Sequence, residues 1–329
     1  MKEQGFLKKA RRFLGGNGCF FGLIFMIVVA TLINTSFLTP TNISNVLRQM
    51  STNSIIALGM AVVIISGSID LSVGSLYCLS AFISIYFSQY NAVLAVVITL
   101  AASTFIGLIN GLLVTKLDIH PWIATLSMML GLRGLVLVLA NENTYKPPVA
   151  NASFEAIARQ PIFTYLNWPI VIMVVLTVAV GLFLKYTGAG RDVYARGGNV
   201  EAARMMGVNV HRTLINAHLI SGFMTGVSGI ILASRIGSVS PLAGDGGEMY
   251  AIASCVVGGV HLSGGRGKIG NVFIGAAIIG MLTNIFNMQN VLSTFWESVI
   301  TGSLVLIVVF IQQMAALREE RRKRVTEAI

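Results

Sequence analysis

Long apolar runs recur along the whole chain, and they constrain its fold more than any other feature of the sequence. A helix needs about 20 apolar residues to cross a bilayer, and only helices and closed barrels satisfy their own backbone there. We therefore predict an all-α polytopic membrane protein with about ten membrane helices, or eight if one pair of short segments is re-entrant. The ten apolar segments lie at about 18–38, 54–67, 71–88, 92–115, 121–140, 168–186, 214–235, 248–262, 269–288 and 294–314.

The composition argues against most other classes of protein. Apolar residues make up 55% of the 329 residues and charged residues only 11%, whereas a soluble domain is roughly one-quarter charged. Such a chain has too few polar groups to cover a water-exposed surface, which disfavours a soluble enzyme, a nucleic-acid binder and a disordered chain. The lipid bilayer is the expected partner, and nucleic acid is not. Polar residues inside apolar segments are then the first candidates for function, because they are costly in lipid.

The basic residues predict the orientation of the chain in the membrane. If the N-terminus is cytoplasmic, 18 Lys and Arg lie on the cytoplasmic side and four on the outer side. This asymmetry is a strong positive-inside signal, and it places both termini in the cytoplasm. We expect a basic N-terminus at 1–17, a membrane domain at 18–314 and a charged tail at 315–329. A cleaved signal peptide is the alternative for the first segment, but no small-residue cleavage site closes it.

Two polar breaks interrupt the apolar pattern in the same way. The first reads SGSIDLSVGS over residues 66–75, and the second reads LAGDGGE over residues 242–248. Each break precedes a short apolar segment, and five segments separate the two. This spacing predicts an inverted repeat, an arrangement in which broken helices often lie near the transported substrate.

Asp70 is the only acidic residue of the first break. Two interpretations stay open for it. The carboxylate can cap the helix expected to start near Leu71, together with the hydroxyls of Ser68 and Ser72. Alternatively, it can form a substrate or proton site at membrane depth.

The polar loop 187–213 contains a predicted helix of two turns. Asn199 is a suitable N-cap, Glu201 falls in the first turn, and Gly207 is a suitable stop. We expect one apolar face, which carries Val200, Ala203 and Met206. A helix this short is not stable alone, so it must dock on its own bundle or on a partner subunit.

The loop and three further phrases resemble one family of transport proteins. The phrases are GRDVYARGGNVEAARMMGVNV at 190–210, SGSIDLSVGS at 66–75, WIATLSMMLGLRG at 122–134 and AIASCVVGGVHLSGGRGKIG at 251–270. Together they resemble the permeases of ribose/galactose-type monosaccharide ABC importers, over nearly the whole chain. The chain departs from the usual pattern in both breaks, at Ser66-Gly67-Ser68 and at residues 244–249, which leaves the sugar open among ribose, galactose, arabinose, xylose and a sugar-like signal.

The resemblance implies a bacterial inner-membrane subunit with several partners. These are two ATP-binding subunits, a second permease copy in a homodimer or heterodimer, and a periplasmic or lipid-anchored sugar-binding protein. The loop would couple ATP hydrolysis to opening of the pathway. Its implied coupling residues are Gly190, Arg191, Gly197, Gly198, Asn199, Glu201, Ala203, Arg204, Met206 and Gly207.

The sugar pathway should be polar but mostly uncharged, because hydroxyls pair with amides and hydroxyls and stack on aromatic rings. Each candidate can equally hold helices together or lie at the membrane interface. The candidates at membrane depth are Ser66, Ser68, Asp70, Asn110, Trp122, Thr125, Ser127, Asn284, Asn287 and Trp296.

The sequence predicts no enzyme active site, cofactor or metal. A P-loop needs a first glycine and a Ser or Thr after its lysine, but Leu262 and Ile269 stand at those positions around Lys268. The histidines and cysteines show no metal-ligand spacing. Two rival functions remain: a secondary transporter with Asp70 as its proton site, and an exporter or channel-like permease of the same family.

Overall fold

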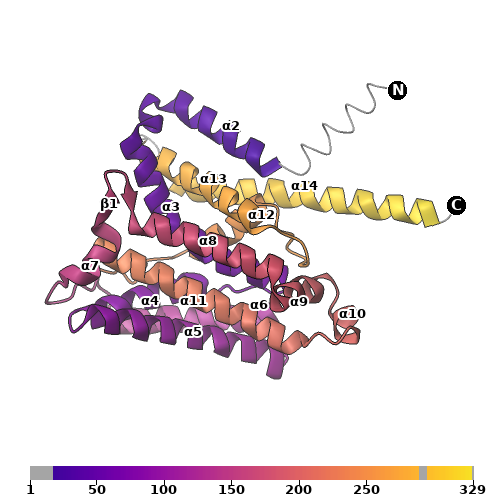
Figure 1. The fold of residues 1–329 in the computed structure, drawn as a ribbon, viewed down its shortest axis with the longest axis horizontal. Helices are drawn as coiled ribbons and strands as arrows, with labels where there is room; N and C mark the ends of the chain where they lie inside the picture. Colours follow the sequence, from indigo (N-terminus) through magenta and orange to yellow (C-terminus); the bar gives the residue numbers. More distant parts are fainter. Residues whose placement is uncertain (1–17, 289–294, 328–329) are drawn as a thin grey trace.

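The computed structural model describes residues 18–288 and 295–327, and these form an elongated helical bundle with one short β-hairpin (Figure 1). The elements are α2 (Gly18–Ile33), η1 (Thr35–Leu38), α3 (Pro40–Ile65), α4 (Val73–Ser88), α5 (Ala92–Lys116), α6 (Pro121–Leu139), α7 (Ala152–Arg159), β1 (Pro161–Phe163), β2 (Leu166–Asn167), α8 (Trp168–Tyr186), α9 (Gly188–Gly198), α10 (Val200–Met205), α11 (Val210–Ile236), α12 (Gly247–Val257), α13 (Ile269–Met288) and α14 (Phe295–Glu327).

Seven of the described helices are long and apolar enough to cross a membrane, and α2, α4 and α12 are shorter apolar helices. All ten apolar segments of the sequence are therefore helical over most of their length. The prediction of an all-α polytopic membrane protein is confirmed.

Helices α3 and α11 form the centre of the bundle. The apolar window of α3 is 83% buried, whereas that of α14 is only 11% buried, so α14 lies on the periphery. Helix α11 packs against α3, α4 and α5. Glycines allow a close approach of α5 and α11, since a Cβ added at Gly107 would lie 2.4 Å from the carbonyl oxygen of His218. With α5 and α11 this close, the side of α11 that carries His218 and Ser221 faces the first break.

The two short helices α4 and α12 begin beside each other inside the bundle. A Cβ added at Gly74 would lie 2.7 Å from the carbonyl oxygen of Gly244 and 2.2 Å from Oε2 of Glu248. Both predicted breaks are therefore present, and each precedes a short helix. The internal inverted repeat stays a prediction.

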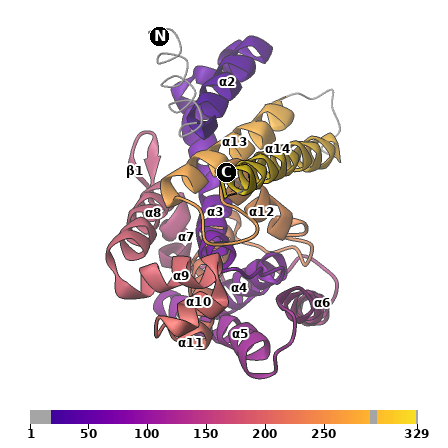
Figure 2. The same ribbon diagram turned by 90° about the vertical axis from the view of Figure 1, so that its right-hand side faces the viewer.

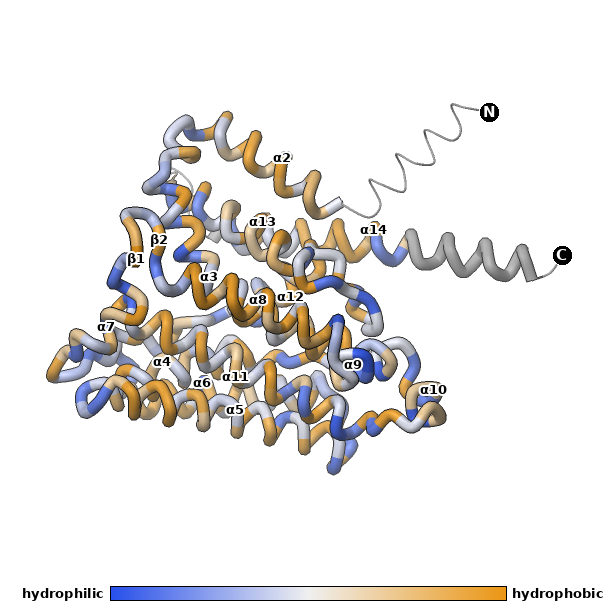
Figure 3. Tube along the Cα trace, viewed as in Figure 1, coloured by the Kyte–Doolittle hydropathy of each residue, from blue (hydrophilic) through white to orange (hydrophobic). Residues whose placement is uncertain are grey.

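The two ends of the bundle are polar and its middle is apolar (Figure 3). One end carries α7 and the hairpin, and we call it the α7 end. The other carries α9 and α10, and we call it the α9 end (Figures 1 and 2). Helix α14 continues to Glu327, so the charged tail extends the last helix, as the sequence suggested. The predicted N-terminal region, 1–17, lies outside the described residues.

The sequence-based boundaries around the second segment were wrong. We expected one helix over 18–38 and the next from 54, but α2 ends at Ile33 and α3 already begins at Pro40. Residues 40–53 are too polar to register as a membrane segment. They are helical because their polar groups find partners: Asn42 donates to Asn284 Oδ1 at 3.1 Å, and Ser44 donates to the carbonyl of Tyr165 at 2.8 Å.

The polar stretch 141–167 and the loop before Asn199 also contain structure that we did not predict. Helix α7 begins at Ala152 and is capped by Asn151, whose side chain accepts the Phe154 N–H, and it buries Phe154 and Ala158. Helix α9 occupies residues expected to be loop. Its glycines lower intrinsic helix propensity, but tertiary contacts that only glycine permits hold it in place.

Candidate functional site

Helices α9 and α10 form a compact unit at one end of the bundle (Figure 2). Thr187 accepts the Gly190 N–H at 3.0 Å and caps α9. Asn199 accepts the Ala202 N–H at 2.9 Å and caps α10, as predicted. Gly207 follows with φ 82°, so the predicted helix stop is confirmed. The predicted short helix is thus present, but it docks on α9 and α11 of its own chain.

The apolar residues of α10 do not form one free face. Ala203 is fully buried within this chain, so the expectation that it shares one docking face with Val200 and Met206 is corrected. Val200 is 37% exposed, and Met205 and Met206 are 89% and 71% exposed. The apolar surface that α10 and its C-cap offer to a partner is therefore mainly these two methionines, with Val200 and the exposed Glu201–Arg204 pair also accessible.

A junction of glycines joins α9 to the first break. A Cβ added at Gly197 would lie 1.8 Å from the carbonyl oxygen of Ile65, and one at Gly264 would lie 2.9 Å from both Gly197 O and Gly67 Cα. The Gly265 N–H donates to the same Ile65 carbonyl at 2.8 Å. Gly67, Gly264 and Gly265 have φ values of 79°, 86° and 69°, which favour glycine. Three backbone segments thus meet here without intervening side chains: α9, the first break and the turn before α13.

Two side chains of α9 strengthen this glycine junction. Arg196 donates from Nη1 to the carbonyl of Ser66 and from Nε to the carbonyl of Val210 at 3.1 Å. Tyr194 donates its hydroxyl to the carbonyl of Gly267 at 2.9 Å. Burial lowers the pKa of the Arg196 guanidinium and raises that of the Tyr194 phenol, because each charged form loses water. These contacts attach α9 to residues 65–67 of the first break and to the turn before α13.

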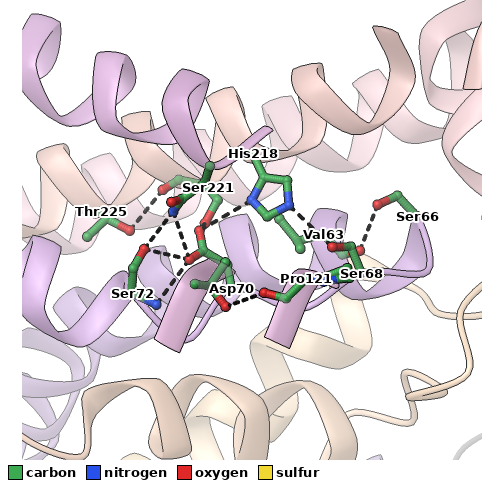
Figure 4. Close-up of polar contacts among 11 residues, drawn as sticks. Val63, Ser66, Ser68, Asp70, Ser72, Pro121, His218, Ser221 and Thr225 are labelled. Atoms are coloured by element: carbon green, nitrogen blue, oxygen red, sulfur yellow. Dashed lines mark hydrogen bonds and ion pairs between the residues drawn. The ribbon is translucent and has the colours of Figure 1, made fainter. Parts of the chain in front are cut away.

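Asp70 lies in a fully buried polar cluster three residues beyond the junction (Figure 4). Its Oδ1 accepts the backbone N–H of Ser72 at 3.1 Å and the Ser72 hydroxyl at 2.6 Å. Its Oδ2 accepts the Ser221 hydroxyl at 3.0 Å and lies 3.7 Å from His218 Nδ1. Asn110 donates to Ser72 Oγ at 2.8 Å. The cluster therefore connects the break with α5 and α11.

The cluster has unused hydrogen-bonding capacity. Ser68 Oγ lies 3.3 Å from His218 Nε2, but the opposite ring nitrogen, Nδ1, makes no hydrogen bond, and neither does Oδ1 of Asn110. The 3.7 Å separation from Asp70 is too long for one. Buried polar atoms normally have hydrogen-bond partners. These two atoms have none, so each can gain a hydrogen bond if the cluster rearranges, and neither has one to lose.

The structure supports part of the cap interpretation of Asp70. The Ser72 N–H bond is the expected local contact, but α4 begins at Val73 with Ser72, not Asp70, as its N-cap residue. Asp70 also accepts the Ser72 hydroxyl within the break, and its bonds to Ser221 and Asn110 reach α11 and α5. Asp70 is thus both a local acceptor and the centre of a network between helices.

The structure brings together only some of the predicted pathway residues. Ser66, Ser68, Asp70 and Asn110 all lie at the first break, and Ser66 also donates to the Val63 carbonyl. Asn284 instead pairs with Asn42 near the start of α3, roughly 35 Å along that helix from the break. Thr125 donates to its own helix, at the carbonyl of Pro121. The four others, Trp122, Ser127, Asn287 and Trp296, are exposed.

His218 and Ser221 were missed as site residues. A signal was present, because polar residues recur at 218, 221, 225 and 228 with helical spacing inside an apolar segment. The spacing of the histidines predicts no metal site and gives no other indication of a role for His218. In the structure both side chains are fully buried on the face of α11 that meets the break.

Arg133 and Glu248 were also missed. Arg133 donates from Nη1 to the carbonyls of Pro241 at 3.0 Å and Ala243 at 3.1 Å, and its Nη2 lies 3.7 Å from Asp245 Oδ1. It therefore holds the turns that lead into α12. Glu248 is nine-tenths buried at the start of α12, and its Oε2 has no hydrogen-bond partner.

Comparisons with known proteins identify relatives along nearly the whole chain. The ribose import permease protein RbsC of Bacillus subtilis (strain 168) is 39% identical over 90% of this chain and 92% of the relative. The protein of the same name from Escherichia coli (strain K12) is 36% identical over 88% of this chain and 91% of the relative. The xylose transport system permease protein XylH of the same strain is 31% identical over 86% and 87%. No solved structure gave a significant match.

The family comparison covers the break, the glycine junction and the α9–α10 unit together. The sequence profile described as "Branched-chain amino acid transport system / permease component" matches residues 42–309. This range leaves out only the ends of the chain. The chain therefore belongs to this family of transport permeases.

Proposed function

We propose that this chain is the membrane-spanning permease subunit of an ATP-driven importer for a monosaccharide, with ribose the first sugar to test. The observation that carries the proposal is the 39% identity to a ribose import permease protein over 90% of the chain. A second relative named for xylose is less similar, at 31%. Ribose and xylose, the sugars in these two names, are both pentoses, which supports a small neutral sugar as the transported substrate.

Separate ATP-binding subunits supply the energy in this proposal. They dock at the α9 end, where Met205 and Met206 are exposed on α10. Two exposed methionines on a capped helix suit a partner groove, because thioether side chains adapt to irregular surfaces. The excess of Lys and Arg assigned to this side supports an orientation in which it lies, with both termini, on the cytoplasmic side of a bacterial inner membrane.

A second permease copy and a sugar-binding protein complete the proposed importer. The binding protein, periplasmic or lipid-anchored, docks at the α7 end, which then faces outward. The pathway forms between two permease copies, homodimeric or heterodimeric, so exposed residues such as Trp122 can face it. The first break, with Ser66, Ser68 and Asp70, supplies a buried polar element next to that route.

The glycine junction carries the coupling in this proposal. ATP binding moves the partner subunits, the α9–α10 unit follows, and Arg196 and Gly197 move residues 65–67. The break then shifts against the Asp70 cluster, and the pathway changes the side to which it opens. Alternating access of this kind needs two stable arrangements of one element.

A secondary transporter with Asp70 as its proton site is not favoured. The relatives are permease proteins of sugar import and transport systems by name. The Asp70 carboxylate is also fully buried beside His218, and it accepts hydrogen bonds from Ser72 and Ser221 that connect the first break with α11.

Uptake assays test the proposal. We expect labelled ribose to enter cells that lack their own ribose uptake only when the chain is co-expressed with an ATP-binding subunit and a sugar-binding protein. The pure chain should neither hydrolyse ATP nor transport sugar into liposomes under an ion gradient. Ion-driven uptake by the chain alone would contradict the proposal and support the secondary transporter.

A further inference from the structure

A cavity of about 840 Å³ lies at the α9 end of the bundle, between the end of α8, the first turns of α9 and the start of α13. Its lining includes three cationic residues, Lys185, Arg191 and Lys268, and no acidic residue. Two tyrosines, Tyr186 and Tyr194, also line it. The sugar pathway does not use this cavity, and of the coupling region only Arg191 and Tyr194 line it.

Within the part of the chain that the structure describes, the three cations have no carboxylate partner. None of them appears in an ion pair among the described residues, although the Lys185 ammonium lies 4.8 Å from the ring centroid of Tyr186. Like charges around one cavity repel each other. Helix α13 begins in the cavity wall at Ile269, and its N-terminus adds further positive potential. The site is therefore complementary to an anion.

An apolar stripe leads directly into this basic cavity. Val174, Val178 and Leu182 recur every four residues along α8, and each is about half exposed. Val178 and Leu182 also line the cavity. Along one helix, the surface thus changes from apolar to cationic within the two turns before the end of α8. A free phosphate would contact only the cationic residues of the cavity, whereas an amphiphile would contact both these residues and the apolar stripe.

We propose that this cavity binds an anionic phospholipid, with its phosphate between Lys185, Arg191 and Lys268 and its acyl chains along the α8 stripe. Basic pockets between membrane helices on the cytoplasmic side suit such headgroups. The Tyr186 hydroxyl at the polar boundary can donate to the phosphate or to the ester oxygens, whereas the Tyr194 hydroxyl already donates to the carbonyl of Gly267. The proposal goes beyond the transport function and needs neither the sugar nor the ATP-binding subunits to be correct.

The lipid would also contact the coupling region. Tyr194 lines the cavity and donates its hydroxyl to Gly267, in the turn beside the glycine junction. A bound phosphate next to Arg191 and Tyr194 would hold the first turns of α9 against α13. Lipid binding would therefore favour the arrangement of α9 seen here.

Native mass spectrometry of the purified chain tests the proposal, with phosphatidylglycerol as the probe and phosphatidylethanolamine as the zwitterionic comparison. We expect phosphatidylglycerol to bind more tightly. The double variant Lys185→Gln/Lys268→Gln should weaken it about 25-fold, from about fivefold for each lost charge. Lys116→Gln, at the end of α5 and outside the cavity, is the matched control and should change nothing. Inorganic phosphate in excess should not displace the lipid.

Three results would overturn the proposal. The first is unchanged phosphatidylglycerol affinity in the double variant, and the second is equal affinity for phosphatidylethanolamine. The third is loss of the ATP-binding subunits from the double variant while lipid affinity stays normal, which would assign the cavity to a protein partner. The substituted lysines are exposed, so the variants should fold. A single symmetric gel-filtration peak checks this.

Discussion

The contact between Gly197 and Ile65 leads to the sharpest prediction of the coupling mechanism. An alanine Cβ at residue 197 would lie 1.8 Å from the Ile65 carbonyl oxygen and 2.6 Å from the Gly265 N. Both neighbours are backbone atoms, so neither can rotate away. In a close-packed site α9 must then move from the break by about 1 Å or more. Such overpacking costs about 1–3 kcal/mol.

The adjacent glycine provides a matched control. A Cβ at Gly198 would meet nothing within 4 Å. Gly198→Ala adds the same methyl group, one residue along the same helix, without any collision. A difference in transport between Gly197→Ala and Gly198→Ala therefore arises from the collision at the glycine junction and not from a change in helix propensity.

The assay is sugar uptake and ATP hydrolysis by the complete importer in proteoliposomes. Gly197→Ala should keep its ATP-binding subunits, because the exposed methionines of α10 lie outside the junction. A cost of 1–3 kcal/mol on one coupled arrangement should lower the sugar transported per ATP roughly 5- to 150-fold. Gly198→Ala should behave as the parent. If Gly197→Ala imports as much sugar per ATP as Gly198→Ala, the junction does not transmit movement and the coupling argument fails.

Further variants test the neighbouring sites. Asp70→Asn keeps an acceptor for the cluster and should retain some transport with normal folding. Asp70→Leu leaves several buried donors unpaired, at about 1–3 kcal/mol each, and should lower the yield of folded protein in gel filtration. Met206→Glu should abolish co-purification of the ATP-binding subunits with unchanged protease resistance. Ala203→Glu should expose α10 to proteolysis, because it buries a lone carboxylate. Arg133→Gln should lower the melting temperature of the chain, whereas Arg133→Lys should lower it less.

The sequence predicted the helical segments well because lipid imposes a simple rule. A segment of about 20 apolar residues has few alternatives to a membrane helix. The rule fails where polar residues of a helix find hydrogen-bond partners elsewhere in the chain, and the first half of α3 is such a case. Asn42 and Ser44 lower its hydropathy, yet they donate to Asn284 and to the carbonyl of Tyr165. Those partners are more than 100 residues away, so no local pattern reveals them.

Helix α9 shows the opposite limitation. Gly188, Gly190, Gly197 and Gly198 make its sequence resemble a loop, because glycine is a poor helix former. The structure gives a reason for two of them. A Cβ at Gly190 would lie 2.3 Å from the Phe183 carbonyl oxygen, and Gly197 closes on the break. Tertiary contacts therefore override the low helix propensity of glycine at the positions where the backbone of α9 packs directly against the backbone of another segment.

The candidate site was only half visible in the sequence. Asp70 and Asn110 were identified because polar residues at membrane depth are unusual. His218 was not, because its partners come from another part of the chain. Its role depends on the approach of α11 to the break, which Gly107 and Gly222 permit through backbone contact between α5 and α11. Such pairing is a property of the assembled bundle.

The break is held at two points that lie four residues apart in sequence. At Ser66 its carbonyl accepts from Arg196, and at Asp70 its carboxylate accepts from Ser72 and Ser221. Gly67, in the left-handed conformation, lies between them. A short linker cannot absorb a large displacement of α9, so the movement must either rotate Gly67 or change the contacts of the Asp70 cluster. The cluster already has unpaired atoms on His218 and Asn110, which gives it partners for a second arrangement. We therefore place the switch of the proposed transport cycle in this cluster, and its trigger in α9.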